Sequence, residues 1–427
     1  MSTYLLAANP IHGHVGPILQ VARHLVGLGH DVTVLTGARF QGRVVAGGAA
    51  FRALTGRADY DDREPDTYLP DRARYSGVAR AQYDIRTIFV ETIPDQFRSL
   101  RAAIDDIRPD AVLVDGAFGG ALPMLASPSE RPPILALGVT PLSQSSRSLA
   151  PYGMGLPPAR SALGRLRYAA LGAVARKVIF RPTQQAGRRA FAECGETLTG
   201  FVMDASREFD GFLQTGVAEM EYPRDDLAAN TVFVGVLPQD RSQTDVPDWW
   251  DDLEPGPVVH VTQGTIDNRD FDRLVRPTLD ALAHDALTVV VSAGGRGVET
   301  VGDLPANARA ETYLSYDLLL PRLDVFVTNG GFGGVQAALA AGVPIVIAGD
   351  TEDKPEVAAR VAWTGAGVDL GTGTPTPTAI RDAVRTILAD PSYRRSAERI
   401  AHRADQHDAL AEIARRLSET PVRGSAR

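Results

Sequence analysis

Two histidines stand two residues apart near the start of the chain, in the segment His12-Gly13-His14 that follows an apolar run over Tyr4–Asn9. An imidazole titrates near pH 6.5, so a histidine can take the proton from a hydroxyl group that attacks an electrophilic carbon. A carboxylate against the other ring nitrogen would fix the tautomer and stabilise the imidazolium, and Asp115 follows a second apolar run. Asp115 is also a favoured helix N-cap residue, and a loop histidine is often only a surface residue. The candidate acid–base pair is therefore His14 with Asp115, and His12 is the competing histidine.

A glycine-rich turn, Asn329-Gly330-Gly331-Phe332-Gly333-Gly334, leads from an apolar run over Val325–Thr328 into an amphipathic run over Gly334–Ala341. Glycines let a backbone approach a phosphate group closely, and a helix N-terminus supplies free N–H donors with a favourable dipole. The same turn can also be a tight strand-to-helix connection without a ligand. It is a candidate phosphate site.

The elements that would position these residues alternate between short apolar strands and longer amphipathic helices. The predicted strands are Tyr4–Asn9, Asp31–Thr36, Ala111–Val114, Ile134–Leu137, Val258–Thr262, Leu287–Ser292, Val325–Thr328 and Pro344–Ala348. The predicted helices include Val15–Leu28, Phe271–His284, Gly334–Ala341 and Ser392–Leu417. Strands separated by helices, without tight hairpin turns, indicate right-handed crossovers and parallel sheets. Open parallel sheets bind ligands at the carboxyl ends of their strands, which is where the candidate residues stand.

The chain is too long for one hydrophobic core, because single cores stop growing at roughly 250–300 residues. The polar, proline-rich segment from Pro238 to Pro257 is the best candidate for a linker. We therefore expect an α/β protein with two Rossmann-like domains. The expected divisions are a first domain over residues 1–215, a linker region over 216–257, a second domain over 258–391, and a C-terminal helix with a short tail over 392–427 that returns to the first domain.

Composition excludes whole classes of function. A net charge of -8 argues against a nucleic-acid partner, which would require clustered cations. Cys194 is the only cysteine, so an intrachain disulfide or a cysteine metal cluster cannot form, which suits a reducing cytoplasm. The segment Met1-Ser2-Thr3 lacks the basic region of a signal peptide, and no apolar stretch approaches the roughly 20 residues of a bilayer span. We expect a cytoplasmic protein without a membrane partner.

Over nearly its whole length the sequence resembles family 1 glycosyltransferases, the group that includes bacterial antibiotic and macrolide glycosyltransferases. His12-Gly13-His14-Val15-Gly16-Pro17 is similar to the family's Gly-His-Val-Asn-Pro signature, with Gly16 where Asn is usual. Further matching fragments are Pro109–Asp115, the glycine-rich turn, Ala341-Gly342-Val343-Pro344, Asp353-Lys354-Pro355 and Gly365-Ala366-Gly367. Their order and spacing agree with the family, which makes the resemblance specific.

The resemblance implies the GT-B fold, in which two Rossmann-like domains face across a cleft. It implies an inverting transfer of a hexose from a UDP- or TDP-sugar to a hydroxyl of a small, partly apolar acceptor such as an antibiotic. The first domain would bind the acceptor and the second the nucleotide sugar, with His14 as the base and Asp115 as its partner. No metal or other cofactor is expected, and the protein would be a monomer or homodimer.

The resemblance also assigns donor-binding residues. Gly264 and Thr265 would contact the diphosphate, Tyr313 would stack on the nucleobase, and the Leu314 backbone would read the edge of that base. The remaining donor residues would be Asn329, Gly331, Gly333 and Gly334 at the diphosphate, Gln336 at the ribose, and Asp353 and Lys354 at the sugar. Tyr313 could instead be a packed end of a strand, and Lys354 a solvated side chain.

The chain departs from the family at four positions in or beside the predicted donor site. Asn329 stands where the family has His, Gly334 where Ser or Thr is common, and Ala337 where a Glu holds the ribose. Lys354 replaces a Gln, which leaves the donor sugar open. Acceptor residues are expected among Phe118, Thr140, Tyr152 and Met154, although each could equally belong to the core.

Three other functions are alternatives to sugar transfer. A catalytically degenerate sugar-nucleotide or metabolite binder is motivated by Asn329, Gly334 and Ala337. A nucleotide-sugar 2-epimerase shares the architecture, but it would need acids over the sugar in place of the His14–Asp115 pair. A nicotinamide-dependent oxidoreductase would need Gly-x-Gly-x-x-Gly after the first strand, where His12–Pro17 stands.

Overall fold

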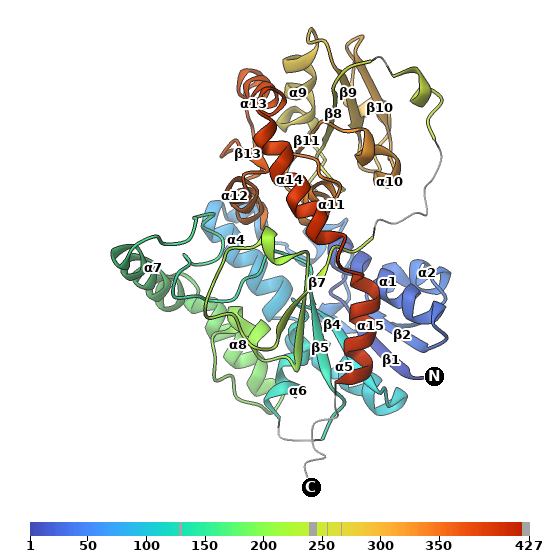
Figure 1. Ribbon diagram of the computed structural model, residues 1–427. Helices are drawn as coiled ribbons and strands as arrows, with labels where there is room; N and C mark the ends of the chain where they lie inside the picture. Colours follow the sequence, from blue (N-terminus) through green and yellow to red (C-terminus); the bar gives the residue numbers. More distant parts are fainter. Residues whose placement is uncertain (128–129, 239–245, 254, 266, 421–427) are drawn as a thin grey trace.

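The structure is a computed structural model that describes residues 1–127, 130–238, 246–253, 255–265 and 267–420 (Figure 1). It contains two sheets whose strands all pair in parallel, so the expected α/β architecture of two Rossmann-like domains is confirmed. The seven-stranded sheet of the first domain has the order β3 (Ala50–Ala53), β2 (Asp31–Thr36), β1 (Thr3–Ala7), β4 (Ala111–Asp115), β5 (Ile134–Gly138), β6 (Gly211–Thr215) and β7 (Thr231–Gly235). The six-stranded sheet of the second domain has the order β10 (Ala308–Glu311), β9 (Thr288–Ser292), β8 (Val258–Thr262), β11 (Val325–Thr328), β12 (Ile345–Ile347) and β13 (Gly367–Asp369).

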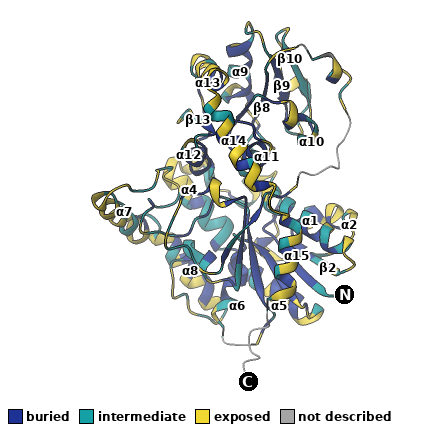
Figure 2. Ribbon diagram, viewed as in Figure 1, coloured by how far each residue is buried: buried dark blue, intermediate teal, exposed yellow. Residues whose placement is uncertain are grey.

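Helices cover both faces of each sheet, and each face has its own apolar core. Every residue of β4, β5, β8 and β9 is buried, as expected for parallel strands that are covered on both sides (Figure 2). The helices of the first domain are α1 (His12–Gly27), α2 (Gln41–Ala46), α3 (Pro65–Tyr68), α4 (Gly77–Ile85), α5 (Ile93–Ile107), α6 (Leu122–Ala126), α7 (Ala162–Val174) and α8 (Arg181–Glu193). Those of the second domain are α9 (Val275–Leu282), α10 (Tyr316–Leu319), α11 (Phe332–Ala340), α12 (Lys354–Thr364), α13 (Pro377–Ala389) and α14 (Pro391–Ala404).

The first domain extends further along the chain than predicted. Strand β7 pairs with β6 in the first sheet, so the expected boundary at residue 215 is too early. Burial of Val234 in the first core explains why this strand belongs to the domain and not to a linker. Part of the proline-rich segment over 238–257 lies outside the described residues.

The predicted helix over 392–417 is two helices. Helix α14 packs in the second domain through Ala397, Ile400 and Ala404, whereas α15 (Ala409–Glu419) packs in the first domain through Ile413 and Leu417. The chain turns between them, and the carboxylate of Asp408 caps α15 by accepting from the Ala411 N–H at 3.0 Å. Two helices are needed because their buried faces belong to the cores of different domains.

None of the helices in the described part of the chain combines the length and the apolar character that a bilayer span requires.

Candidate active site

His14 lies in the first turn of α1, above the carboxyl ends of β1 and β4, which are neighbours in the sheet. The chain leaves β1 at Ala7 and stays extended at Ile11, so α1 begins at His12 and its first turn faces the end of β4. The Nδ1 atom of His14 lies 2.9 Å from Oδ1 of Asp115, whose side chain is fully buried, whereas the His14 side chain is 13% exposed. The structure therefore brings together the two residues that the sequence pairs, and Nε2 of His14 is the ring nitrogen left to exchange a proton.

Asp115 is held by further hydrogen bonds. Its Oδ2 accepts from the backbone N–H and the side-chain amide of Asn9, at 2.6 and 3.0 Å, and its Oδ1 also accepts from the Ala117 N–H at 2.8 Å. Oδ1 of Asn9 in turn accepts from Gln96 at 2.7 Å, and Gln96 accepts from the Gly120 N–H at 2.8 Å. This buried relay fixes the carboxylate in position and satisfies its charge. Sequence reasoning missed both amides: Asn9 follows the first strand and could have been suspected, whereas nothing local marks Gln96.

The environments of the two histidines drive their pKa values in opposite directions. Burial alone would lower the pKa of His14, but the charge and hydrogen bond of Asp115, together with Asp353 and Glu352, raise it above 6.5. Burial and the cations Arg43 and Arg39 lower the pKa of His12 to about 4. A base needs an opposite charge to stabilise the imidazolium that it forms, and only His14 has one.

The second domain contributes acidic groups to the surroundings of His14. Asp353 immediately precedes α12, and burial, followed by the charge of Glu352, raises the pKa of its carboxyl group to about 6. Asp353 and His14 influence each other's titration across the domain boundary, so the domains meet at the candidate active site. The ring of Phe89, which sequence reasoning did not single out, lies 5.9 Å from that of His14.

The glycine-rich turn forms an open helix N-terminus. Gly331 is the N-cap of α11, no side chain caps this helix, and the positions that side chains would take at Gly331 and Gly333 are free of protein atoms within 4 Å. The first N–H groups of a helix have no acceptor within the helix, so this turn can donate to a phosphate. A Cβ atom at Gly334 would meet the hydroxyl of Tyr316 at 3.4 Å, an ordinary van der Waals contact. Thr265 and Tyr313 are exposed.

Two side chains predicted to bind the donor, those of Asn329 and Gln336, donate hydrogen bonds to backbone carbonyl groups of the protein. The side-chain amide of Asn329 is buried and donates to the backbone oxygen of Gln263 at 2.7 Å, which joins the loops after β8 and β11. The amide of Gln336 is buried and donates to the backbone oxygen of Thr215 at 2.9 Å, at the end of β6 in the other domain. In this conformation each amide donates to a protein carbonyl, and its contact with the diphosphate or the ribose stays a prediction.

Lys354 is also engaged by protein groups. Its ammonium lies 2.6 Å from a carboxylate oxygen of Glu352 and 3.4 Å from one of Asp267, and it donates to the Thr351 hydroxyl at 3.0 Å. The side chain is buried, which differs from the solvated alternative considered for it. Contact with the donor sugar stays a prediction for Lys354 and Asp353. The Leu314 side chain packs in the second core, which leaves only its backbone for the nucleobase.

Among the residues predicted to bind the acceptor, Phe118 differs from the prediction because its side chain is inaccessible. Its ring is fully buried in the first domain, where it packs in the core beneath the sheet. Tyr152 hydrogen bonds to Thr140, and burial, followed by the nearby Asp353, raises the pKa of its phenol well above 10. Tyr152 and Thr140 therefore lie near Asp353 at the start of α12. Met154, two residues after Tyr152 in the same loop, is exposed.

A buried carboxylate that sequence reasoning missed, Glu356, ties the loop containing Tyr152 and Met154 to the second domain. Its Oε1 accepts from the backbone N–H groups of Gly153 and Gly155, at 2.8 and 2.9 Å. Its Oε2 pairs with Arg360 at 2.6 Å, and Arg360 pairs with Glu221 of the first domain at 2.8 Å. We name these three charged residues the interdomain clamp. The local sequence gives only the pair with Arg360, which is common on helices, because the glycines that Glu356 binds are about 200 residues away.

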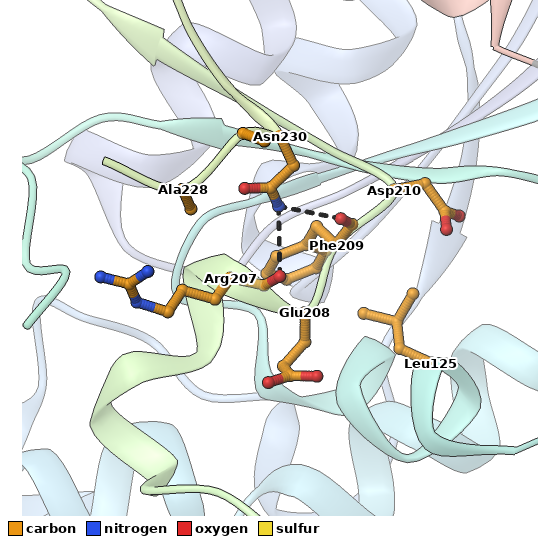
Figure 3. Close-up of a pocket in the computed structure, with 8 residues that line it drawn as sticks. Leu125, Arg207, Glu208, Phe209, Asp210, Ala228 and Asn230 are labelled. Carbon is orange, nitrogen blue, oxygen red and sulfur yellow. Dashed lines mark hydrogen bonds between the residues drawn. The ribbon is translucent and has the colours of Figure 1, made fainter. Parts of the chain in front are cut away.

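A surface depression of about 530 Å³ lies elsewhere in the first domain (Figure 3). Asp210 and Asn230 line it, and they immediately precede β6 and β7, so it lies at the amino ends of these strands. The Asn230 amide is used to hold the backbone there, as it donates to the Phe209 oxygen at 2.9 Å. Reacting groups of parallel sheets lie at the opposite, carboxyl edge, which is where His14 stands.

The chain is similar to known glycosyltransferases. The family described as "Erythromycin biosynthesis protein CIII-like, C-terminal domain" matches residues 276–420. The chain is 37% identical to 4'-demethylrebeccamycin synthase of Lentzea aerocolonigenes, covering 95% of this chain and 96% of the relative. It is 35% identical to UDP-glucosyltransferase A1 of Starmerella bombicola, covering 95% and 89%. The solved structure of the glycotransferase of kitacinnamycin has the same fold, with a TM-score of 0.74, 22% identity, and coverage of 98% of this chain and 99% of that one.

Proposed function

This chain belongs to the UDP-glycosyltransferase family and is a glycosyltransferase, and from this premise we propose that it transfers a hexose from a UDP- or TDP-sugar to a hydroxyl of a small, partly apolar acceptor, with inversion. The observation that carries the proposal is the contact between His14 and Asp115 at the boundary between the domains. The names of the relatives, which include an antibiotic biosynthesis protein and a UDP-glucosyltransferase, support the acceptor and donor classes.

His14 acts as the general base. The acceptor oxygen forms the new bond to the anomeric carbon while its proton passes to Nε2 of His14. The bond from that carbon to the diphosphate oxygen breaks, and its electron pair leaves with the nucleotide diphosphate. Attack from the face opposite the leaving group inverts the configuration. Asp115 stays ionised and stabilises the imidazolium through Nδ1.

The leaving diphosphate is bound by backbone groups more than by side chains. The open N-terminus of α11 at Gly331 and Gly333 supplies N–H donors and a positive dipole end. The Asn329 amide stabilises this loop by donating a hydrogen bond to the backbone oxygen of Gln263. Asp353 accepts hydrogen bonds from sugar hydroxyls, and its electrostatic interaction with His14 supports this role.

The acceptor lies on the first-domain side, between the aromatic ring of Phe89 and the loop containing Tyr152 and Met154. This loop is exposed at Met154 and fixed by the interdomain clamp at Gly153 and Gly155. An apolar ring system with one hydroxyl directed at His14 fits this combination. We also propose that the reaction needs no metal and takes place in the cytoplasm, which the single cysteine suits.

The test is a mass-spectrometric screen of UDP- and TDP-hexoses against a panel of phenolic and alcoholic metabolites, with and without EDTA. The expected result is a product heavier by one hexosyl unit whose anomeric configuration, measured by NMR, is opposite to that of the donor. Retention of configuration, or loss of activity with EDTA, contradicts the mechanism. Binding of UDP by calorimetry without turnover of any acceptor would favour the degenerate binder, and conversion of a UDP-sugar alone to its epimer would favour the epimerase.

A further inference from the structure

Helix α7 follows the acceptor loop, which contains Tyr152 and Met154, and is exposed to solvent along its length. It projects at the left edge of the molecule in Figure 1 and is largely yellow in Figure 2. None of its residues is buried, and it continues into a π-helical turn over Ala175–Ile179. A helix gains most of its stability from packing one face, so an exposed helix of this length calls for a partner surface.

The exposed side of this segment carries an apolar stripe. Leu163 is 76% exposed, Leu166 67%, Val174 48% and Val178 66%, and the exposed Ala170 lies between them. These residues recur at intervals of three or four, so they share one face of the helix. Side chains of this size are normally buried, and a contiguous exposed row of them marks a binding surface.

The same segment is strongly basic. Residues 160–181 include Arg160, Arg165, Arg167, Arg176, Lys177 and Arg181 and no acidic residue, although the whole chain has a net charge of -8. All six cations are exposed. At the helical repeat, Arg167 and Lys177 fall on the same face as the apolar stripe, whereas Arg165 and Arg176 fall on the opposite face. Long basic side chains among exposed apolar ones can extend to lipid headgroups while the apolar side chains enter the bilayer, as in helices that lie in the interface of an anionic bilayer.

We propose that α7 and the turn after it form a docking surface for the headgroup region of an anionic lipid bilayer. The apolar stripe enters the boundary between headgroups and acyl chains, and the arginines bind lipid phosphates. A second copy of the chain fits less well, because a symmetric contact along this face would bring the two sets of six cations together. The expectation of no membrane partner was based on the absence of a spanning segment, which does not bear on surface binding.

The position of α7 next to the acceptor loop suggests that membrane binding helps the enzyme to meet its acceptor, an inference that rests on the proposed function. The helix follows directly after the loop of Tyr152 and Met154, which the structure fixes next to the active-site side of α12. An apolar acceptor partitions into bilayers. An enzyme held at the bilayer by α7 would meet such an acceptor beside its acceptor loop.

The test is flotation of the full chain with vesicles of phosphatidylcholine alone or mixed with phosphatidylglycerol, without substrates, so the result is independent of sugar transfer. The expected result is binding to the anionic vesicles only. Replacing both Arg167 and Lys177 by Ala should weaken binding by about 30-fold, and a double variant, Leu163→Glu with Leu166→Glu, should weaken it further. The matched control is Val45→Glu on α2, also an exposed apolar residue, which should bind as wild type does.

Thermal unfolding of each variant checks that the fold is retained, which exposed positions should allow. Failure of the wild-type chain to bind anionic vesicles overturns the proposal, and so does undiminished binding by the Leu163→Glu, Leu166→Glu variant. Sedimentation velocity provides the other decisive outcome: a dimer that this double variant dissociates, without vesicle binding, assigns the face to a second copy.

Discussion

The two domains use the ends of their parallel strands differently. In the first domain, Asp115 contacts His14 and is itself held by the side-chain amides of Asn9 and Gln96. In the second domain, the amides of Asn329 and Gln336 hold the protein together, and the backbone at Gly331 and Gly333 is left open. In the mechanism that we propose, the enzyme therefore relies on side-chain chemistry for the acceptor and on backbone geometry for the leaving group. Substitutions should therefore cost far more activity on the first side than on the second.

The largest effect is expected for His14→Ala. Loss of the general base should lower kcat by about 10²–10⁴-fold, while the Kd for UDP measured by calorimetry stays close to that of wild type. The matched control is His12→Ala, two residues away in the same helical turn, which should keep most of the activity because its imidazole is not paired with a carboxylate. Equal losses in the two variants would remove the distinction between the histidines.

Asp115→Asn should come next. The amide keeps the shape of the carboxylate but cannot stabilise the imidazolium, so kcat should fall by up to about 10⁴-fold. Binding of UDP should again be unaffected. Steady-state kinetics with a saturating donor measure the loss, and an Asn variant with wild-type kcat would mean that Asp115 only caps its loop.

A smaller effect is expected at the interdomain clamp. Glu356→Gln keeps an acceptor for Gly153 and Gly155 but loses the charge that strengthens both bonds and the pair with Arg360. The KM for the acceptor should rise by about tenfold, equivalent to roughly 1.4 kcal/mol, with a smaller change in kcat. Glu412→Gln, which breaks an ion pair on α15, is the control for general effects of charge. An unchanged acceptor KM at normal thermal stability would show that the clamp does not position the loop.

The smallest effect is expected for Lys354→Gln. The change releases Glu352 and Asp267 beside Asp353, so the ratio of kcat/KM for two UDP-hexoses should change by a few-fold, and the preference for UDP over TDP should stay. Arg385→Gln, an exposed member of an ion pair, is the control. Identical sugar selectivity in the variant and the wild type would remove Lys354 from the donor site.

The fold was largely predictable because its main strands are short segments rich in valine, leucine and other apolar residues. The predicted bounds of Asp31–Thr36, Val258–Thr262 and Val325–Thr328 agree with the structure. Strand β6 has polar residues at Gln214 and Thr215 and gave no such signal. The break between α14 and α15 was missed because Ile400, Ala404, Ala409, Ile413 and Leu417 keep a nearly helical spacing across it.

The site was predictable where short motifs define it and not where distant partners do. The pairing of His14 with Asp115 follows from motifs at the ends of two neighbouring strands. The roles of Asn329 and Gln336 depend on carbonyls 66 and 121 residues away, which no local pattern encodes. Phe118 fits an aromatic pocket and an aromatic core equally well on sequence, and only burial decides between them.

The central claim is that Asp115 raises the basicity of His14 for catalysis, and the pH dependence of kcat/KM tests it most directly. The free enzyme is active with His14 neutral, so activity should rise with pH through the pKa of His14, with a midpoint above 6.5 in the wild type. In Asp115→Asn, burial without the opposite charge should move that midpoint to lower pH. The same midpoint in both proteins, or a profile with no acidic limb, would contradict the account.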